Sequence, residues 1–329
     1  MKKKILALVL TAAMCMTAVT GCGSAEGAQD SGAASADKVY RIGVCQLLEH
    51  PALDAATQGF KDALVAKLGD KVTFDVQNAQ GEQATAATIC NGLVADNVDL
   101  IMANATTPLQ AAAAATTTIP ILGTSVTDYG TALEVENWSG VSGRNISGTS
   151  DLAPIDEQEN MLVEIFPNAQ KVGLLYCTAE ANSKYQIELF KAALDADGIA
   201  YQEYGIADTN EVQSVVTTAA EECDVVYIPT DNTLANVTET VYNILIPAGV
   251  PCIAGEEGIC SGCGVATLSI NYYDLGYTTG EMAVEILTGG ADITTMPVKF
   301  APNVTKKYNA KICEELGITV PDDYVAISE

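Results

Sequence analysis

The segments VYRIGVC (residues 39–45) and KVGLLYC (residues 171–177) are apolar runs that each predict a buried β-strand. Each is followed by a similar segment with a helical pattern, FKDAL at 60–64 and FKAAL at 190–194. An aspartate-led strand and then a proline-led strand follow in both halves, at 99–102 and 120–123, and at 224–227 and 251–255. This repeat predicts an α/β fold of two similar lobes, each a doubly wound parallel sheet covered by helices.

The residues after Asn271 are too few for a third lobe. They predict a helix over 273–287, a short strand over 297–302 and a final helix over 309–316, which complete the two lobes. The chain is expected to cross between the lobes near 146–150, 270–274 and 298–303, and these crossings form a hinge. The expected division is 38–148 plus 273–299 for the N-terminal lobe, and 149–272 plus 300–329 for the C-terminal lobe.

The first residues have the pattern of a targeting segment. Three lysines precede a mostly apolar run from Ile5 to Val19, which is shorter than the ~20 residues that a membrane-spanning helix needs. The run ends in Val19-Thr20-Gly21-Cys22, which resembles a bacterial lipobox with Cys22 as the lipidated residue. We expect a signal peptide over 1–21, a flexible tether over 22–37, and a protein outside the cytoplasm that a lipid anchors to the cell membrane. The alternative is an ordinary secretory signal with an incidental cysteine.

The composition excludes several classes of function. The chain has 329 residues, 16 Lys and Arg against 42 Asp and Glu, and a formal net charge of −26. A surface this acidic repels phosphate backbones, so we expect no nucleic-acid partner. A single histidine argues against His-rich metal sites and conventional His-based catalysis. Neither the GxGxxG loop nor the Gly-Lys pair of nucleotide-binding loops occurs, and we expect no cofactor and no metal.

Eight of the ten cysteines lie beyond Cys22, several of them inside strand-like apolar runs. There they behave as small buried hydrophobic residues, and free core thiols are the favoured interpretation. Cys260 and Cys263 have the spacing of a redox or metal pair, but no second pair or nearby histidine completes a zinc site. One local disulfide, or a metal, stays open as an alternative.

The candidate binding residues lie in polar loops that follow the predicted strands. In parallel α/β sheets ligands bind at the carboxyl ends of strands, and two facing lobes would bring two such edges together across a cleft. The competing interpretation of each loop is helix capping and turn formation. The expected ligand-binding residues are Gln46, Leu48, Asn104, Ala105, Thr106, Thr124, Ser125, Val126, Asp151, Tyr176, Asn182, Asp231, Asn232 and Glu256.

These loops contain hydroxyls, amides and carboxylates but no Arg or Lys. Phosphates and dicarboxylates favour a cationic fork, so such ligands are disfavoured and a zwitterion fits better. Hydroxyls and backbone NH groups of the first lobe can hold a carboxylate, and Asp151 or Asp231 can hold an ammonium group. Leu47, Leu48, Leu53 and Val126, with Tyr176 and Tyr272 or Tyr273, could accept an apolar or aromatic side chain, although the tyrosines also fit ordinary packing.

Five segments together carry a resemblance to a known family: EHPALD (49–54), NAT (104–106), GTSVTD (123–128), ISGTSD (146–151) and NYYDLG (271–276). In these segments the chain resembles ABC-transporter substrate-binding lipoproteins of the periplasmic-binding-protein-like I class, and in particular the family linked to importers of tryptophan and related amino acids. The resemblance implies that the loops with Thr106 and Ser125 bind the ligand's carboxylate and that Asp151 binds its amine. It also implies permease and ATPase partners, a monomer, and neither catalysis nor a cofactor.

Other functions were weighed against this one. A protein of the same fold could instead bind a sugar, a nucleoside or another small solute. It could also be a ligand-sensing partner of a membrane kinase. Gly258-Ile259-Cys260-Ser261-Gly262 matches a nucleophile elbow with cysteine in place of serine. A cysteine hydrolase needs a histidine to form the thiolate, and His50 precedes Pro51 at an expected helix start. We therefore expect that the protein is not an enzyme.

Overall fold

The computed structural model describes residues 38–301 and 303–328. From residue 39 onward, the described residues form one compact unit, which contains all the helices and strands considered below. The expected signal peptide, the tether and Cys22 lie outside the described residues. No helix within the described ranges combines the length and the apolar character needed to cross a membrane.

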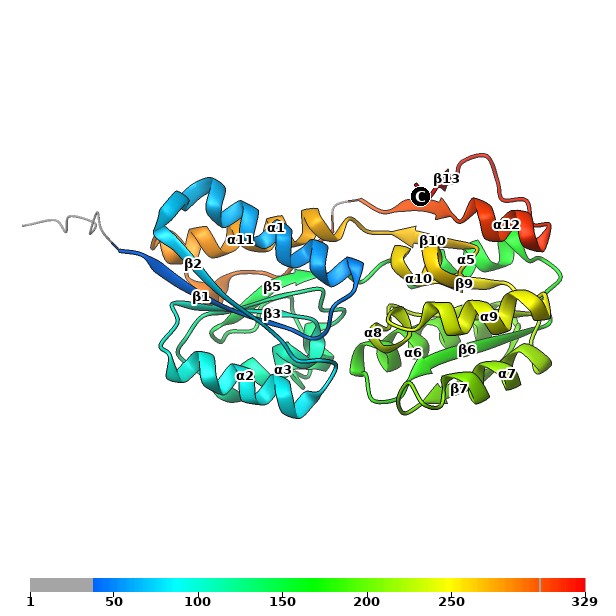
Figure 1. Cartoon of the computed structure of the whole chain (residues 1–329), viewed down its shortest axis with the longest axis horizontal. Helices are drawn as coiled ribbons and strands as arrows, with labels where there is room; N and C mark the ends of the chain where they lie inside the picture. Colours follow the sequence, from blue (N-terminus) through cyan, green and yellow to red (C-terminus); the bar gives the residue numbers. More distant parts are fainter. Residues whose placement is uncertain (1–37, 302, 329) are drawn as a thin grey trace, which may run out of the picture. The chain divides into compact units, whose positions relative to one another are not determined.

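The first sheet has the strand order β11-β5-β4-β3-β1-β2 within the described residues, and all its neighbouring strands are parallel. Figure 1 shows helices on both sides of this sheet: α1 and α11 cover one face, and α2 and α3 cover the other. We call this sheet with its helices the first lobe. Its strands are β1 (Tyr40–Gln46), β2 (Val72–Asn78), β3 (Leu100–Asn104), β4 (Ile121–Thr124), β5 (Ile146–Ser150) and β11 (Lys299–Phe300), and its helices are α1 (Pro51–Leu68), α2 (Gln83–Ala95), α3 (Thr106–Ala115), α4 (Tyr129–Ala132) and α11 (Tyr272–Leu287), with short 3₁₀ turns at Gly69–Lys71 and Ile293–Thr295.

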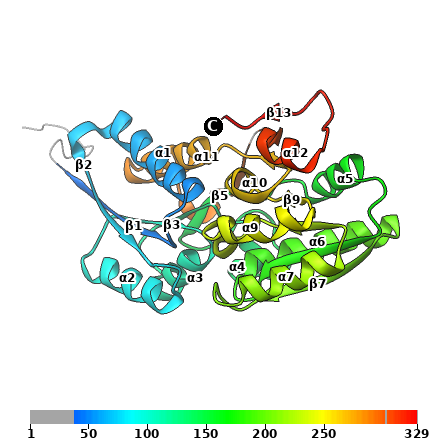
Figure 2. The same ribbon diagram turned by 45° about the vertical axis from the view of Figure 1, so that its right-hand side comes forward.

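The second sheet has the order β13-β12-β10-β9-β8-β6-β7, and β12 runs antiparallel to β10. Figures 1 and 2 both show α9 between α7 and α10 on one face, and α5, α6 and α12 pack on the other. We call this sheet with its helices the second lobe. Its strands are β6 (Lys171–Cys177), β7 (Ala200–Ile206), β8 (Val225–Ile228), β9 (Cys252–Ala254), β10 (Ala266–Ser269), β12 (Thr305–Tyr308) and β13 (Val325–Ala326), and its helices are α5 (Ile155–Ile165), α6 (Ala181–Asp197), α7 (Val212–Glu222), α8 (Asn232–Ala235), α9 (Thr238–Ala248), α10 (Glu257–Cys263) and α12 (Ala310–Leu316).

The α/β fold expected from the repeat is confirmed. The duplicated first strands form β1 and β6, and both have helices on each face because alternate side chains along the strand point to opposite sides. In β1, Ile42 and Val44 pack with α1 and α11, whereas Cys45 packs with α2 and α3. The sequence did not predict the short strands β12 and β13. The exact lobe boundaries remain a prediction.

Helix α11 follows β10, a strand of the second sheet, and packs against α1 in the first lobe. The two backbones approach closely at glycines, because a Cβ atom on Gly276 would overlap the carbonyl oxygen of Ala56, and one on Gly59 would overlap that of Tyr273. Only glycine permits such an approach. These contacts fix the segment that returns from the second lobe to the first.

The eight cysteines beyond Cys22 are all buried and unpaired. Cys260 and Cys263 lie in α10 and belong to the hydrophobic core of the second lobe. The interpretation of these residues as core thiols is confirmed, and the alternative of a local disulfide at Cys260 and Cys263 is not observed in this part of the chain.

Candidate functional site

Loops at the carboxyl ends of strands from both sheets enclose a small chamber of about 10 Å³, roughly enough for one water molecule. Six of the expected binding residues line it. It is lined by Ser125, Asp151, Asn182, Asp231, Asn232 and Glu256, together with His50, Leu53, Thr127, Thr230, Ala235 and Tyr272.

The first lobe contributes two loops with unusual backbone geometry. Ala105, between β3 and α3, has φ 96° and ψ 168°, a region that is essentially restricted to glycine. Ser125, after β4, has φ 54°. The backbone NH of Ala105 donates to the carbonyl of Thr124 at 3.0 Å, so the start of α3 lies beside the loop that carries Ser125. The strained backbone therefore holds a helix N-terminus next to this loop.

Two buried polar atoms in this part of the first lobe lack a hydrogen-bond partner among the described residues. They are the hydroxyl of Ser125 and Oδ1 of Asn104. Ser125 lines the chamber, whereas the amide nitrogen of Asn104 donates to the carbonyl of Leu53 and to the hydroxyl of Thr57. A buried polar atom without a partner is unfavourable, so the Ser125 hydroxyl is suited to bind a polar ligand atom.

Asp151 follows β5, where the chain leaves the first sheet, and its side chain is only 3% exposed. Its two carboxylate oxygens accept hydrogen bonds from neutral hydroxyls, Oδ2 from Tyr272 at 2.9 Å and Oδ1 from Thr127 at 3.2 Å. Burial raises the pKa of Asp151 above its ordinary value, and the two hydroxyls only partly oppose that shift. No lysine or arginine is among the chamber-lining residues, so a cation beside this carboxylate would be stabilised.

The second lobe contributes Asp231 and Glu256, and both carboxylates cap helices. Asp231 accepts hydrogen bonds from the backbone NH groups of Leu234 and Cys177 and from the hydroxyl of Ser183. Glu256 accepts from the first NH groups of α10. Burial raises the pKa of each group to about 7. Capping, the competing interpretation at the sequence level, therefore accounts for both of these hydrogen bonds of Glu256 but for only one of the three of Asp231.

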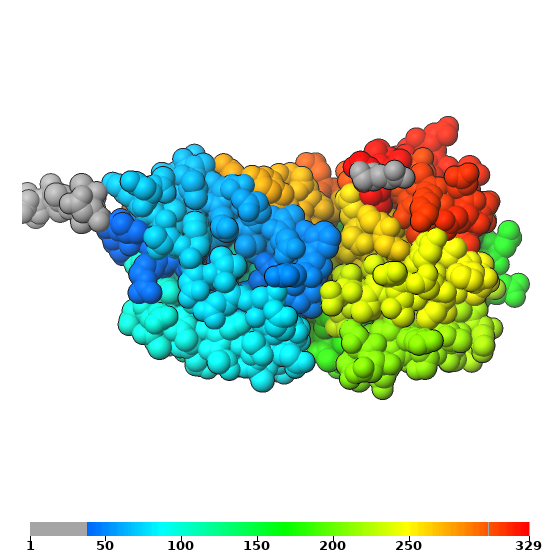
Figure 3. All heavy atoms as spheres, viewed as in Figure 1, coloured from blue at the N-terminus to red at the C-terminus, as the bar shows by residue number. Residues whose placement is uncertain are grey.

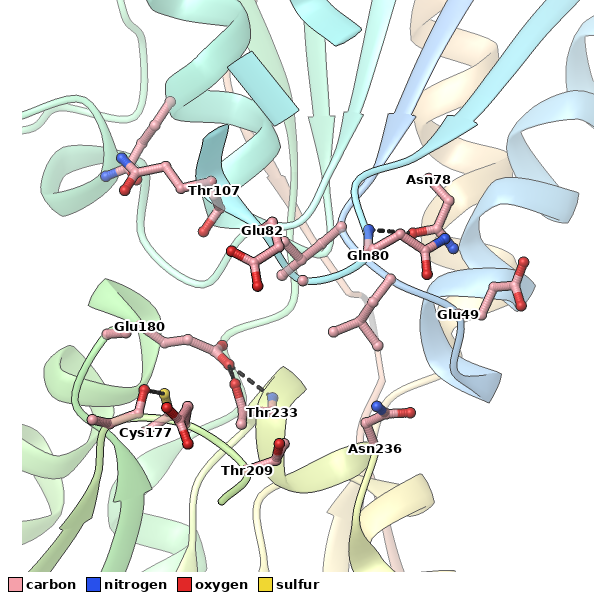
Figure 4. Close-up of a pocket in the computed structure, with 18 residues that line it drawn as sticks. Glu49, Asn78, Gln80, Glu82, Thr107, Cys177, Glu180, Thr209, Thr233 and Asn236 are labelled. Atoms are coloured by element: carbon pink, nitrogen blue, oxygen red, sulfur yellow. Dashed lines mark hydrogen bonds between the residues drawn. The ribbon is translucent and has the colours of Figure 1, made fainter. Parts of the chain in front are cut away.

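A larger cleft of about 730 Å³ lies beside the chamber. Figure 3 shows a hollow between the cyan residues of the first lobe and the yellow and light-green residues of the second. Figure 4 shows Glu49, Gln80 and Glu82 on one side of the cleft, and Glu180 with Thr233 on the other. The lining is polar and contains no lysine or arginine, and the expected residue Leu48 lies here.

The structure places seven expected residues in neither cavity. The hydroxyl of Tyr176 donates to Glu203 of the neighbouring strand β7 at 2.7 Å. Strand residues point to either face of a sheet in turn, and the sequence did not reveal which face Tyr176 takes. The remaining six serve the first lobe itself, in its hydrogen bonds, its apolar packing or the start of α3: Gln46, Asn104, Ala105, Thr106, Thr124 and Val126.

Leu53 and Tyr272, which the sequence suggested as contacts for the ligand's side chain, also line the chamber, whereas His50, Thr127, Thr230 and Ala235 were not among the expected binding residues. His50 was interpreted as part of a helix start, and it is the N-cap of α1, but its side chain makes no capping bond. The signal that could have identified it is its position in the loop that follows β1, since Leu48 of the same loop was already an expected binding residue.

Comparisons with known proteins agree with this architecture. The family described as ABC transporter substrate binding protein matches residues 41–328. The tyrosine-binding protein of Clostridioides difficile (strain R20291) is 37% identical over 293 residues, which cover 87% of this chain and 85% of that protein.

Two solved structures are informative. A domain from Streptococcus pneumonia in complex with L-Trp is 34% identical with a TM-score of 0.82, and the match covers 87% of this chain and 97% of that chain. The ligand-free, open structure of a substrate-binding protein with adhesive properties from Clostridium difficile is 38% identical, but its TM-score is 0.68, over 88% of this chain and 100% of that chain. By TM-score, the structure is thus more similar to the L-Trp complex than to the open structure. The chain belongs to the ABC transporter substrate-binding protein family, with a periplasmic-binding-protein-like I fold.

Proposed function

We propose that this protein captures an amino acid with an aromatic or other hydrophobic side chain and delivers it to the permease of an ABC importer. The relatives that bind tyrosine and L-Trp support this ligand class, since each is at least 34% identical over most of the chain. The single observation that carries the proposal is the chamber, in which the buried carboxylate of Asp151 and the unpaired hydroxyl of Ser125 are both among the lining groups.

In this proposal, Asp151 pairs with the ligand's ammonium group. The carboxylate already accepts hydrogen bonds from Tyr272 and Thr127, which orient it, and the chamber lining offers it no other cation. The ligand's carboxylate binds to the hydroxyl of Ser125 and to the NH groups at the start of α3, beginning at Thr106. The first NH groups of a helix have no partner within the helix, and they favour an anion.

Binding requires movement of the lobes. A chamber of about 10 Å³ is far too small for an amino acid, so the lobes open to admit it and then close around it. The ligand shifts the equilibrium between the open and closed forms towards the closed form, to an extent set by the difference between its affinities for the two forms. The crossings near 146–150, 270–274 and 298–303 are the proposed hinge, between lobes divided as expected from the sequence.

The cellular setting follows from the family and from the first residues. ABC transporter substrate-binding proteins are extracytoplasmic. We propose that Cys22 carries a lipid anchor, that residues 22–37 serve as the tether, and that a permease and an ATPase are the partners. The proposed role is binding without catalysis.

A thermal-shift screen tests the ligand class. Tyrosine, tryptophan, phenylalanine and leucine are compared with glucose and adenosine, because a ligand that binds the folded state raises the melting temperature by mass action. At least one of the four amino acids is expected to raise it, with the affinity then measured by calorimetry. Stabilisation by glucose or adenosine, with no effect of any amino acid, would reject the proposed ligand class.

A further inference from the structure

The side chain of His50 connects the two lobes directly. His50 lies in the loop between β1 and α1 of the first lobe, and Asn232 is the first residue of α8 in the second. Nε2 of His50 lies 3.2 Å from Oδ1 of Asn232, and each residue is only 8% exposed. Both residues also line the chamber.

Glu180 determines which way the amide of Asn232 points. An ionised carboxylate can only accept hydrogen bonds, so the Asn232 group that faces Oε2 of Glu180 at 2.7 Å is Nδ2. Oδ1 of Asn232 must then face His50 and can only accept. Nε2 of His50 therefore carries a proton and donates it to this bond.

Glu180 is itself firmly held. Its carboxylate also accepts hydrogen bonds from the backbone NH and hydroxyl of Thr233, each at 2.8 Å, and from the amide of Asn182 at 2.9 Å. Glu180 is 6% exposed. The carboxylate of Glu180, which orients Asn232, is thus held by residues of the second lobe alone and does not need the first lobe to be in contact.

We propose that His50 and Asn232 form a latch that holds the lobes closed, and that Glu180 is the positioning residue that orients the latch. This inference rests on the proposed closure around a ligand. Because the bond spans the lobes, it stabilises the closed form and slows release of the ligand, with little effect on the encounter between the ligand and the open form. A hydrogen bond of this kind changes an equilibrium by about three- to tenfold.

The first test is a double-mutant cycle on the rate of ligand dissociation, measured by stopped flow with an amino acid that the protein binds. His50→Ala and Asn232→Ala are each expected to accelerate dissociation about three- to tenfold, with association changed less than twofold. The double variant is expected to be no faster than the faster single variant. His50→Gln, whose amide can still donate, should recover part of the loss, and Asn91→Ala, an exposed asparagine on α2, is the control. Effects of the two substitutions that simply add would overturn the latch.

The second test does not depend on dissociation rates. His50 is the only histidine in the chain, so ¹⁵N-histidine NMR reports on this residue alone. With saturating amino acid, the spectrum should show the tautomer with the proton on Nε2, and Asn232→Ala and Glu180→Gln should each shift that signal. An unchanged signal in Asn232→Ala would contradict the contact. If the wild-type protein binds no amino acid, the proposed function fails, whereas normal binding with an additive cycle rejects only the latch.

Discussion

The hydroxyl of Tyr272 donates a 2.9 Å hydrogen bond to Oδ2 of Asp151. Asp151 directly follows β5 and Tyr272 begins α11, so the bond joins two segments by which the chain passes between its sheets. Both side chains line the chamber, and both are buried. The proposed ammonium site at Asp151 therefore adjoins the proposed hinge, and in this proposal ligand binding acts directly on the segments that bend.

Replacement of Asp151 tests its proposed role. Asp151→Asn keeps the shape of the side chain but removes its charge, so affinity for the amino acid should fall more than tenfold in calorimetry. Tyr272→Phe, which removes one donor to that carboxylate, should have a smaller effect of about two- to fivefold. Asp274→Asn, on the exposed side of α11, is the matched control. Unaltered affinity in Asp151→Asn would reject the pairing.

Glu256 should make the stability of the ligand-free protein depend on pH. Its pKa is raised from 4.5 to about 7 by burial, so the folded state binds a proton that the unfolded state has lost between these values. The stability contributed by this group is fully present below about pH 4.5 and is lost as the pH rises through about 7.

Glu256→Gln removes this titration while keeping an oxygen that can accept from the NH groups of α10. Relative to wild type, the variant should gain on the order of 2 kcal/mol in free energy of unfolding between pH 5 and pH 8, as measured in urea. Glu157→Gln, exposed on α5, should show no such gain. The same difference from wild type at both pH values would contradict the assignment.

Ala105 occupies a backbone conformation that strains any residue except glycine. Ala105→Gly should therefore stabilise the protein by about 1 kcal/mol in denaturant unfolding. Ala111→Gly, in the middle of the helix α3 that follows Ala105, should destabilise it by about 0.5–1 kcal/mol because glycine loses more entropy there. If the two substitutions destabilise the protein equally, Ala105 is not strained in solution.

Two helical glycines should respond to alanine in opposite ways. A Cβ atom on Gly276 would overlap the backbone of Ala56 in α1, so Gly276→Ala should lower the free energy of unfolding by more than about 2 kcal/mol or prevent folding. Gly92 in α2 has open space around it, so Gly92→Ala should raise the free energy of unfolding by about 0.5–1 kcal/mol. Equal effects in thermal or urea unfolding would contradict the close packing of α1 on α11.

The sequence predicted the fold better than the site. Apolar runs that recur in one order indicate strands and helices directly, and β1 and β6 lie where the repeat placed them. Asp151 and Ser125, which line the chamber, were expected binding residues because they follow strands, and a parallel sheet brings the ends of its strands to one edge. Tyr176 lies in neither cavity, and the sequence does not show which face of the sheet a strand residue takes. The contact between His50 and Asn232 could not be predicted because the two residues are distant in sequence. Contacts between lobes depend on how the lobes meet, which local patterns do not encode.

Closure around an amino acid is the central claim, and small-angle X-ray scattering tests it most directly. The radius of gyration is measured without ligand and with a saturating amino acid from the screen, with glucose as the control. The account predicts that the amino acid lowers the radius of gyration and that glucose leaves it unchanged. A radius of gyration that stays the same at full saturation, as judged by calorimetry on the same sample, would contradict it.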